Sequence, residues 1–354
     1  MINSEKITNA LKRIGANDKA RVKLLNTLIA IEEDLFELNF DAREEITAPL
    51  VDSLYSDSKS LQRVLDNGLI IHFPYSSKIS REFIMATPFS TDHVWEPQTT
   101  KLLLELAKNA QHVLIGGAYW GDQTILVANS IKDSGFVHCF ELNDINIGFL
   151  NKNAHTNNLS NIHITEKALW DADNVSVNLS GLDSIETCIE VDGNALNACK
   201  TITIDTYGKN HAISSLDLIM LDIEGGELKA LKGAELYLSM PKNKAPNIVF
   251  EIHRSYVDWT NGLESTDIIK FLAGFGYIFF GIRDYNGNVP MTGKQIELVP
   301  INNIYLDGPH HGFNILAIKD PSIVENDIFL LTPGISPKLL KHRDPKIHSP
   351  LSRL

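Results

Sequence analysis

The stretch HVLIGGAYWG, residues 112–121, decides the fold because a short apolar segment runs directly into a glycine turn. The apolar residues predict a buried strand, and residues 123–132 beyond the turn predict a helix. Glycines at such a turn allow positive φ and let backbone N–H groups approach a ligand closely. A second apolar strand, 136–140, leads into Glu141, where a carboxylate can accept hydrogen bonds from both hydroxyls of a ribose. The stretch therefore predicts a nucleotide-cofactor site.

Helices and apolar strands alternate along the chain from about residue 97. The further strands expected are 162–165, 216–221, 247–252, 277–280 and 313–318, and the further helices are 99–110, 144–157, 226–238 and 266–273. Strands that alternate with helices form right-handed crossovers, so we expect an α/β fold with a doubly wound, mostly parallel, seven-stranded sheet. Residues 172–205 interrupt the alternation, and their pattern of polar and apolar residues predicts a small antiparallel insertion.

Two terminal segments flank this domain, which we expect to span residues 97–325. Residues 1–96 predict a mainly helical cap or oligomerisation segment, helical to about residue 66 and with a short strand at 69–73. In the second case the protein would form a homo-oligomer. Residues 326–354 carry prolines and basic side chains and predict an irregular basic tail.

The composition narrows the function classes. The 354 residues include 32 Lys and Arg against 44 Asp and Glu, which gives a net charge of −12. A surface of that sign repels phosphate backbones, so nucleic acid is not the expected partner. The sequence has no run of about 18 apolar residues, so no membrane span is expected. Its three cysteines form no CxxC pair, which suggests reduced thiols and a cytoplasmic protein.

The spacing of the glycines distinguishes between nucleotide cofactors. Dinucleotide-binding folds usually carry G-x-G-x-x-G, whose glycines face the pyrophosphate. In this chain the third position from Gly116 is Ala118, and the spacing from Gly117 to Gly121 is one residue too long. S-adenosylmethionine carries no phosphate and needs only room beside the turn and an acid for its ribose. The spacing therefore favours S-adenosylmethionine over NAD.

Several motifs in this chain resemble those of the FkbM-type methyltransferases. The matching stretches are FELN at 140–143, NNLSN at 157–161, ALWD at 168–171 and DIEGGELKALKGA at 222–234. The resemblance covers about residues 97–282 and implies a class I methyltransferase-like sheet. It also implies methyl transfer from S-adenosylmethionine to a hydroxyl of a sugar or small natural product. The first-motif aspartate of the family falls at Ile115, and its usual asparagine falls at Tyr119.

The site residues follow from the motifs and from the strand ends. The expected cofactor-binding residues are Gly117, Ala118, Tyr119, Gly121, Glu141, Leu142, Ala168, Trp170 and Asp222. Methyl transfer to a hydroxyl also needs a group that accepts its proton, and in a doubly wound sheet that chemistry lies beyond the carboxyl ends of the strands. The candidate catalytic residues are Asp222, Glu224 and His253, of which the histidine titrates near neutral pH. Asp222, Glu251 and His253 could also hold a metal, and an oxygen-rich set suits Mg²⁺.

Two other function classes stay open from the sequence. A non-catalytic methyltransferase-like subunit that binds a partner protein through its N-terminal segment would explain the apolar residue at position 115. An NAD-dependent oxidoreductase would need tighter glycine spacing. The polar residues that favour an enzyme are Glu141, Asp222, Glu224, Glu227 and His253. For such an enzyme we expect a small-molecule or saccharide acceptor.

Overall fold

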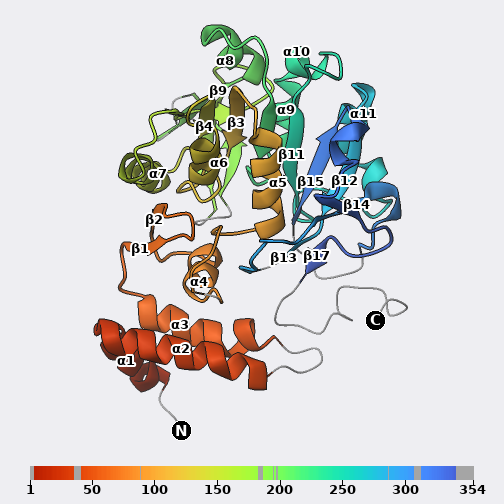
Figure 1. The fold of residues 1–354 in the computed structure, drawn as a ribbon. Coiled ribbons are helices and arrows are strands. Elements are labelled where there is room, and N and C mark those ends of the chain that lie inside the picture. Colours follow the sequence, from red (N-terminus) through yellow and green to blue (C-terminus); the bar gives the residue numbers. More distant parts are fainter. Residues whose placement is uncertain are drawn as a thin grey trace.

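A mixed nine-stranded sheet forms the centre of the molecule in the computed structural model of the chain (Figure 1). The structure describes residues 4–35, 41–87, 89–181, 186–193, 195–196, 198–285, 287–306 and 312–339. The order of the strands across the sheet is β16-β14-β12-β15-β11-β10-β3-β4-β5. Their bounds are β3 (His112–Gly116), β4 (Phe136–Phe140), β5 (Ile162–Thr165), β10 (Leu218–Leu221), β11 (Asn247–Ile252), β12 (Ile278–Ile282), β14 (Ile296–Pro300), β15 (Phe313–Ile318) and β16 (Phe329–Leu331).

Seven of these strands form the doubly wound sheet that the sequence predicts. Strands β5, β4, β3, β10 and β11 are parallel, and β15 pairs antiparallel with both β11 and β12. The sequence order reverses between β3 and β10, which creates the crevice where such sheets bind ligands. Strands β14 and β16 extend the sheet beyond β12 and were not expected, the latter within the predicted irregular tail. Leu330 and Leu331 of β16 are both exposed on this edge strand.

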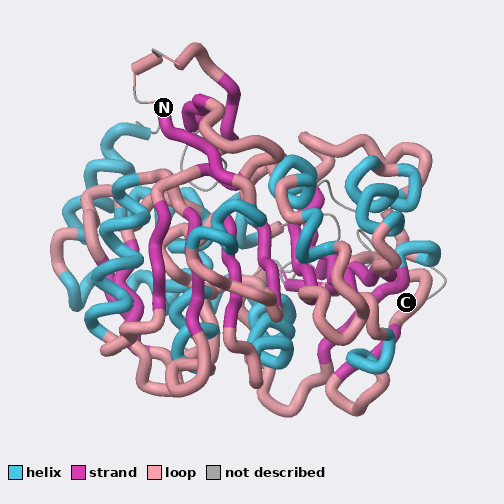
Figure 2. The backbone as a smooth tube through the Cα atoms, turned by 90° about the horizontal axis from the view of Figure 1, so that it is seen from above, coloured by secondary structure: helices cyan, strands magenta, loops and turns pink. Residues whose placement is uncertain are grey.

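The strands are apolar along their whole length because helices cover both faces of the sheet (Figure 2). Alternate side chains enter two separate cores, so Met220 packs on one face while Ile219 and Leu221 pack on the other. Each fully buried aliphatic side chain contributes about 1.5–3 kcal/mol. The covering helices are α5 (Pro97–Ala107), α6 (Thr124–Ser130) and α7 (Asp144–Thr156) on the first face, and α8 (Ile204–Asn210), α9 (Glu227–Lys232), α10 (Glu235–Leu238) and α11 (Asp267–Gly274) on the second.

The expected helix 226–238 is interrupted, so α9 and α10 are two short helices. Gly233 ends α9 and lies so close to the chain that a Cβ there would overlap the backbone carbonyl of Trp170. The interruption thus fits the helices against the backbone at Trp170, directly after strand β6 (Ala168–Leu169). Short 3₁₀ turns complete the fold at Leu263–Ser265, Ile301–Asn303 and Pro321–Val324.

The N-terminal segment is helical with one hairpin. Its helices are α1 (Ser4–Gly15), α2 (Asp18–Asp34), a π-helical turn (Arg43–Thr47) that continues into α3 (Ala48–Tyr55), and α4 (Lys78–Ile84). Strand β1 (Leu61–Val64) occupies residues that the sequence placed in the helical part, and it pairs antiparallel with β2 (Ile70–Phe73). The hairpin forms because Gly68 adopts a φ of 86°, which lets the chain reverse tightly.

Two asparagines of α7 attach this segment to the sheet domain. Asn153 accepts the His72 N–H at 2.7 Å and donates to the His72 carbonyl at 2.8 Å. Asn157 forms the same pair of bonds with Ile70, at 2.8 and 2.7 Å. The side chains thereby satisfy the open edge of β2, and β1, β2 and α4 lie between helices α1–α3 and the carboxyl ends of the sheet strands (Figure 1).

The insertion forms a four-stranded sheet in the order β6-β9-β7-β8. Its strands are β6 (Ala168–Leu169), β7 (Ser176–Ser180), β8 (Thr187–Glu190) and β9 (Cys199–Ile202). Strand β7 is antiparallel to β8 and β9, as predicted, while β6 and β9 are parallel. Ile204 lies within the expected insertion but begins the helix α8. The Thr203 hydroxyl accepts the Thr206 N–H at 3.1 Å and caps this helix.

A last two-stranded pair joins β13 (Asp284–Tyr285) to β17 (Lys338–Leu339) near the C-terminal end of the described chain. All three cysteines are free thiols. Within the described ranges, no helix combines the length and the apolar character needed to cross a membrane.

Candidate cofactor site and carboxylate cluster

The glycine turn between β3 and α6 adopts backbone conformations that require glycine. Gly117 and Gly121 have φ values of 78° and 91°, in the left-handed region. A Cβ at Gly117 would overlap the backbone carbonyl of Asp222, so the turn lies directly against the end of β10. The Gly117 and Ala118 N–H groups donate to the Phe140 carbonyl at 3.0 and 3.1 Å. The turn is therefore fixed to the ends of both neighbouring strands.

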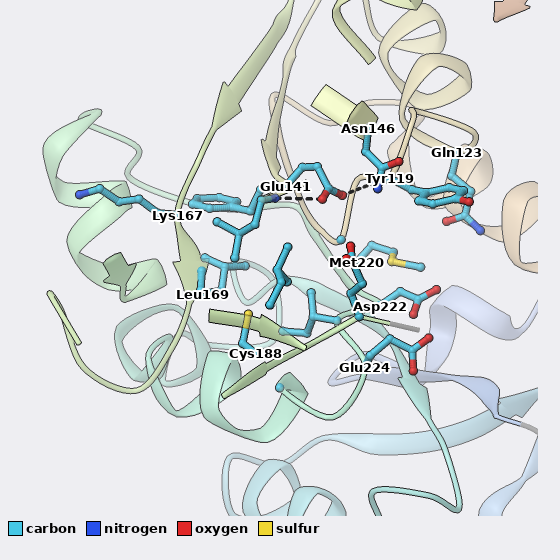
Figure 3. A pocket seen from close by; sticks show the side chains of 18 of the residues that line it. Tyr119, Gln123, Glu141, Asn146, Lys167, Leu169, Cys188, Met220, Asp222 and Glu224 are labelled. Carbon is cyan, nitrogen blue, oxygen red and sulfur yellow. Dashed lines mark hydrogen bonds between the residues drawn. The ribbon is translucent and has the colours of Figure 1, made fainter. Parts of the chain in front are cut away.

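Glu141 connects this turn to the end of β4. One of its carboxylate oxygens accepts the Tyr119 N–H at 2.7 Å, and the other accepts the N–H groups of Leu142 and Asn143 at 2.9 and 2.8 Å (Figure 3). Burial raises the pKa of Glu141 above its ordinary value, while these backbone donors act in the opposite direction. Its side chain lines the cavity and fixes the loops that follow β3 and β4.

A cavity opens at the crevice between β3 and β10, with about 970 Å³ of empty space including its mouth. Among the expected cofactor-binding residues, those that line it are Gly117, Tyr119, Glu141, Leu142, Ala168, Trp170 and Asp222. Ala118 is only 2% exposed, and Gly121 packs on Leu150, so these two shape the turn from behind. Trp95 and Ile79 reach the cavity from the N-terminal segment, and Leu179, Glu186 and Cys188 reach it from the insertion.

Trp170 lies at one wall of the cavity with its ring held from two sides. Its indole N–H donates to the Glu190 carboxylate at 3.2 Å, and the Lys229 ammonium lies 4.2 Å from the ring centroid. Lys229 also pairs with Glu190 at 2.5 Å. These contacts tie the insertion to α9 and orient an aromatic face beside the cavity.

Three carboxyl groups converge at the carboxyl ends of β10 and β11. Oxygens of Asp222, Glu224 and Glu251 lie within 4.8 Å of one another. Burial raises the pKa of Asp222 to about 6. Burial and the Asp222 charge raise the pKa of Glu224 to about 7, and they raise that of Glu251 well above its ordinary value. Such a cluster retains protons near neutral pH and favours a cation.

The loop that presents Glu224 is held in a strained conformation. Glu224 has a φ of 50°, which is uncommon for a residue other than glycine. The Glu227 carboxylate accepts the Ile223 N–H at 2.9 Å and the Gly225 N–H at 3.0 Å. Glu227 thus shapes the loop from within, and Glu224 points towards the cavity beside Asp222 (Figure 3). Strain at such a position is typical of functional sites.

His253 lies near this cluster in a specific tautomer. Its Nδ1 accepts the Ser255 N–H at 3.0 Å, so the neutral ring carries its proton on Nε2. Burial lowers the pKa of His253, and the positive charge of Lys338 acts in the same direction. In this arrangement the ring is a hydrogen-bond donor, and neither nitrogen has a free lone pair for a proton or a metal ion. Glu224, rather than His253, completes the group of possible metal ligands with Asp222 and Glu251.

Two further acids, Glu96 and Asp122, interact with the cluster, and the sequence suggests only Asp122, as a possible substitute for the aspartate missing at position 115. Burial, with the nearby Asp284 and Asp222 charges, raises the pKa of Glu96 to about 8. Burial and Asp222 raise the pKa of Asp122 to about 7, and Asp122 lines the cavity. Asp122 lies directly after the glycine turn. Glu96 approaches the strand ends only through the packing of α5.

The strand order, the glycine turn and the acid after β4 define a class I methyltransferase-like fold. Residues 132–279 match the family model described as the methyltransferase FkbM domain, and this confirms the resemblance predicted from the motifs. This part of the chain is thus similar to the methyltransferase FkbM domain. No curated protein matches the chain.

Several solved structures share some similarity with this chain. Methyltransferase FkbM from Methylobacillus flagellatus KT is 15% identical, with 59% of this chain and 44% of that chain covered and a TM-score of 0.35. The O-methyltransferase from Bacillus cereus in complex with SAH is 16% identical, with 76% and 97% covered and a TM-score of 0.37. The O-methyltransferase TomG from Streptomyces achromogenes, in complex with SAM, is 13% identical, with 76% and 96% covered and a TM-score of 0.35.

Proposed function

We propose that the protein transfers a methyl group from S-adenosylmethionine to a hydroxyl of a sugar or small natural product. The observation that carries the proposal is one cavity that joins the glycine turn and Glu141 at one end to Asp222 and Glu224 at the other. The first end suits the ribose and adenine of the cofactor, with Glu141 facing the ribose. The second end places carboxyl groups where the reacting methyl group and acceptor would meet.

The charge of the cavity supports S-adenosylmethionine. Five acids line it, Asp122, Glu141, Glu186, Asp222 and Glu224, against one base, Lys167. S-adenosylmethionine carries a positive sulfonium and a positive ammonium, whereas NAD would bring a pyrophosphate against the same acids. Opposite charges favour the first ligand and disfavour the second.

Asp122 offers a substitute for the carboxylate that the family carries at position 115. Ile115 is 2% exposed and belongs to the core behind the sheet rather than to the cavity wall. Asp122 lines the cavity close enough to Asp222 for the Asp222 charge to raise its pKa. We assign Asp122 to the ammonium end of the cofactor. The apolar residue at position 115 is then no obstacle to catalysis.

Glu224 is the proposed general base. Its pKa of about 7 is matched to proton transfer at neutral pH, and its carboxylate lines the cavity. Transfer forms the bond between the acceptor oxygen and the methyl carbon and breaks the sulfur–methyl bond. The electron pair stays on sulfur, and the hydroxyl proton passes to Glu224. Asp222 keeps a negative charge beside the sulfonium. His253 acts as a hydrogen-bond donor through its Nε2–H group.

A divalent cation would fit the same end of the cavity. Asp222, Glu224 and Glu251 supply oxygen ligands of the kind that Mg²⁺ prefers, and their mutual distances suit one ion. Such an ion would hold the acceptor oxygen and lower the pKa of its hydroxyl. With Mg²⁺ bound, the carboxyl groups of the cluster would lose their protons, so metal binding would release protons at neutral pH.

Calorimetry with S-adenosylmethionine and S-adenosylhomocysteine, each with and without Mg²⁺, tests the proposal. We expect both ligands to bind, and we expect Glu141→Ala to abolish the signal. Glu235→Ala serves as a control, because this exposed acid of α10 does not line the cavity. If neither ligand gave a calorimetric signal, the proposal of an enzyme would be refuted. A non-catalytic subunit that binds a partner protein would then be favoured.

A further inference from the structure

A second cavity lies in the N-terminal segment and shares no lining residue with the cofactor cavity. It contains about 850 Å³ of empty space including its mouth, and its walls come from α2, α3, β1, β2 and α4. Its lining is mostly aliphatic and aromatic. Among the described residues of the lining, Arg21 and Arg63 are the charged ones, and none is an acid. In a chain of net charge −12, this is a local reversal of sign.

Arg63 is the unusual member of this lining. Its side chain lies between two rings, with its guanidinium carbon 4.7 Å from the Phe83 centroid and 4.1 Å from the Phe89 centroid. The residue is 5% exposed, and within the described part of the chain none of its three nitrogens has a hydrogen-bond partner. Burial lowers the pKa of Arg63 to about 10. The structure therefore buries a cation and leaves its five N–H donors unpaired.

Such a group is costly unless something pairs with it. A guanidinium is charged at any physiological pH, and its planar fork matches a carboxylate or phosphate with two parallel hydrogen bonds. Buried arginines are normally found with such a partner. The two rings cover the faces of the guanidinium, and its buried edge, which is the part that binds anions, has no hydrogen-bond partner among the described residues.

Arg21 adds a second cationic group on the other side of the cavity. It donates to the Gly15 carbonyl at 2.9 Å and to Asp18 at 2.7 Å, which fixes its orientation. Its Nε has no partner among the described residues. Its guanidinium carbon lies 4.9 Å from the Tyr55 ring centroid. Positive charge thus approaches the cavity from both α2 and β1.

We propose that this cavity binds a small organic anion with an apolar body. The carboxylate or phosphate of the ligand pairs with the edge of Arg63, and its apolar part packs on the aliphatic and aromatic walls. Phe89, which is 67% exposed, covers the guanidinium and gives way to the ligand. The site is independent of methyl transfer, because it lies in the segment that precedes the sheet domain.

Calorimetry on the full chain with four eight-carbon probes tests this site. Octanoate and octyl phosphate carry the required charge, and the two arms separate carboxylate from phosphate ligands. Octanol and octyltrimethylammonium have the same tail without the anion. We expect at least one anion to bind at one site per chain, and octanol and the cation to bind at least tenfold more weakly. Equal binding of octanol and octanoate, or no binding of either anion, would overturn the proposal.

Three variants locate the site. Arg63→Met keeps a long apolar side chain and should lose at least tenfold in anion affinity, while Arg13→Met removes an exposed arginine of α1 and should leave it unchanged. Without ligand, Arg63→Met should unfold at the same or a higher temperature, because it removes an unpaired buried charge. A fall of several degrees would show that the arginine already has a partner and would overturn the proposal. Arg21→Met, with a half-buried side chain, should weaken anion binding at least threefold.

Discussion

Replacing Gly117 by alanine separates the glycine turn from the end of β10 and should abolish cofactor binding. Gly117 has a φ of 78°, and an alanine in the left-handed region costs about 1–2 kcal/mol. The added Cβ would also overlap the backbone carbonyl of Asp222, which cannot rotate away as a side chain would. The turn and the strand end must then move apart, and the two walls of the cavity with them. We expect S-adenosylmethionine affinity to fall more than tenfold, or by more than about 1.4 kcal/mol.

Gly148 provides a matched control for this substitution. It lies on the exposed face of α7 in the same domain, and a Cβ there would meet nothing within 4 Å. Alanine at this helical position should stabilise the protein by about 0.5–1 kcal/mol and leave ligand binding unchanged. Calorimetric titration measures the affinity, and denaturant unfolding measures the stability. If Gly117→Ala bound S-adenosylmethionine within threefold of the unaltered protein, the assignment of the turn would be wrong.

Three further changes test other parts of the structure. Protonation removes the negative charge of Glu224, whose pKa is about 7, so S-adenosylmethionine affinity should fall as pH drops from 8 to 6. Glu224→Gln should flatten this profile, and an unaltered slope in calorimetry would argue against Glu224. Burial and the neighbouring histidines lower the pKa of His138 to about 3 in the folded state, against 6.5 when unfolded, so its contribution is complete above pH 6.5 and is lost as pH falls towards 3. At pH 5 this lowers the free energy of unfolding by about 2 kcal/mol. In urea unfolding, the free energy of His138→Gln should therefore drop less between pH 6.5 and 5 than that of the unaltered protein. Asn153→Leu leaves the His72 backbone groups unpaired and should cost about 2–4 kcal/mol, with earlier proteolysis of the N-terminal segment than in Asn151→Leu, which alters a less buried asparagine of the same helix.

The sequence by itself determined the strand, turn, helix and strand between residues 112 and 141 and most of the sheet. These elements depend on local periodicity and on residues such as Gly117, a glycine at a position where the turn needs a positive φ. Five of the seven expected sheet strands have the predicted bounds in the structure. The other two, predicted at 216–221 and 277–280, shift by two residues at most. The FkbM motifs could also be recognised from the sequence, because each is a continuous stretch of residues.

The folded chain adds acids that the sequence did not place beside Asp222. Glu96 precedes a helix far from Asp222 in the chain, yet burial and the Asp222 charge raise its pKa to about 8. His253 has the expected position after β11, but its bond from the Ser255 N–H sets a tautomer that no sequence pattern encodes. Strand β16 and the unpaired Arg63 likewise depend on what packs against them. Periodicity specifies local elements, whereas desolvation, pairing and proton affinity depend on neighbours that only the folded chain brings together.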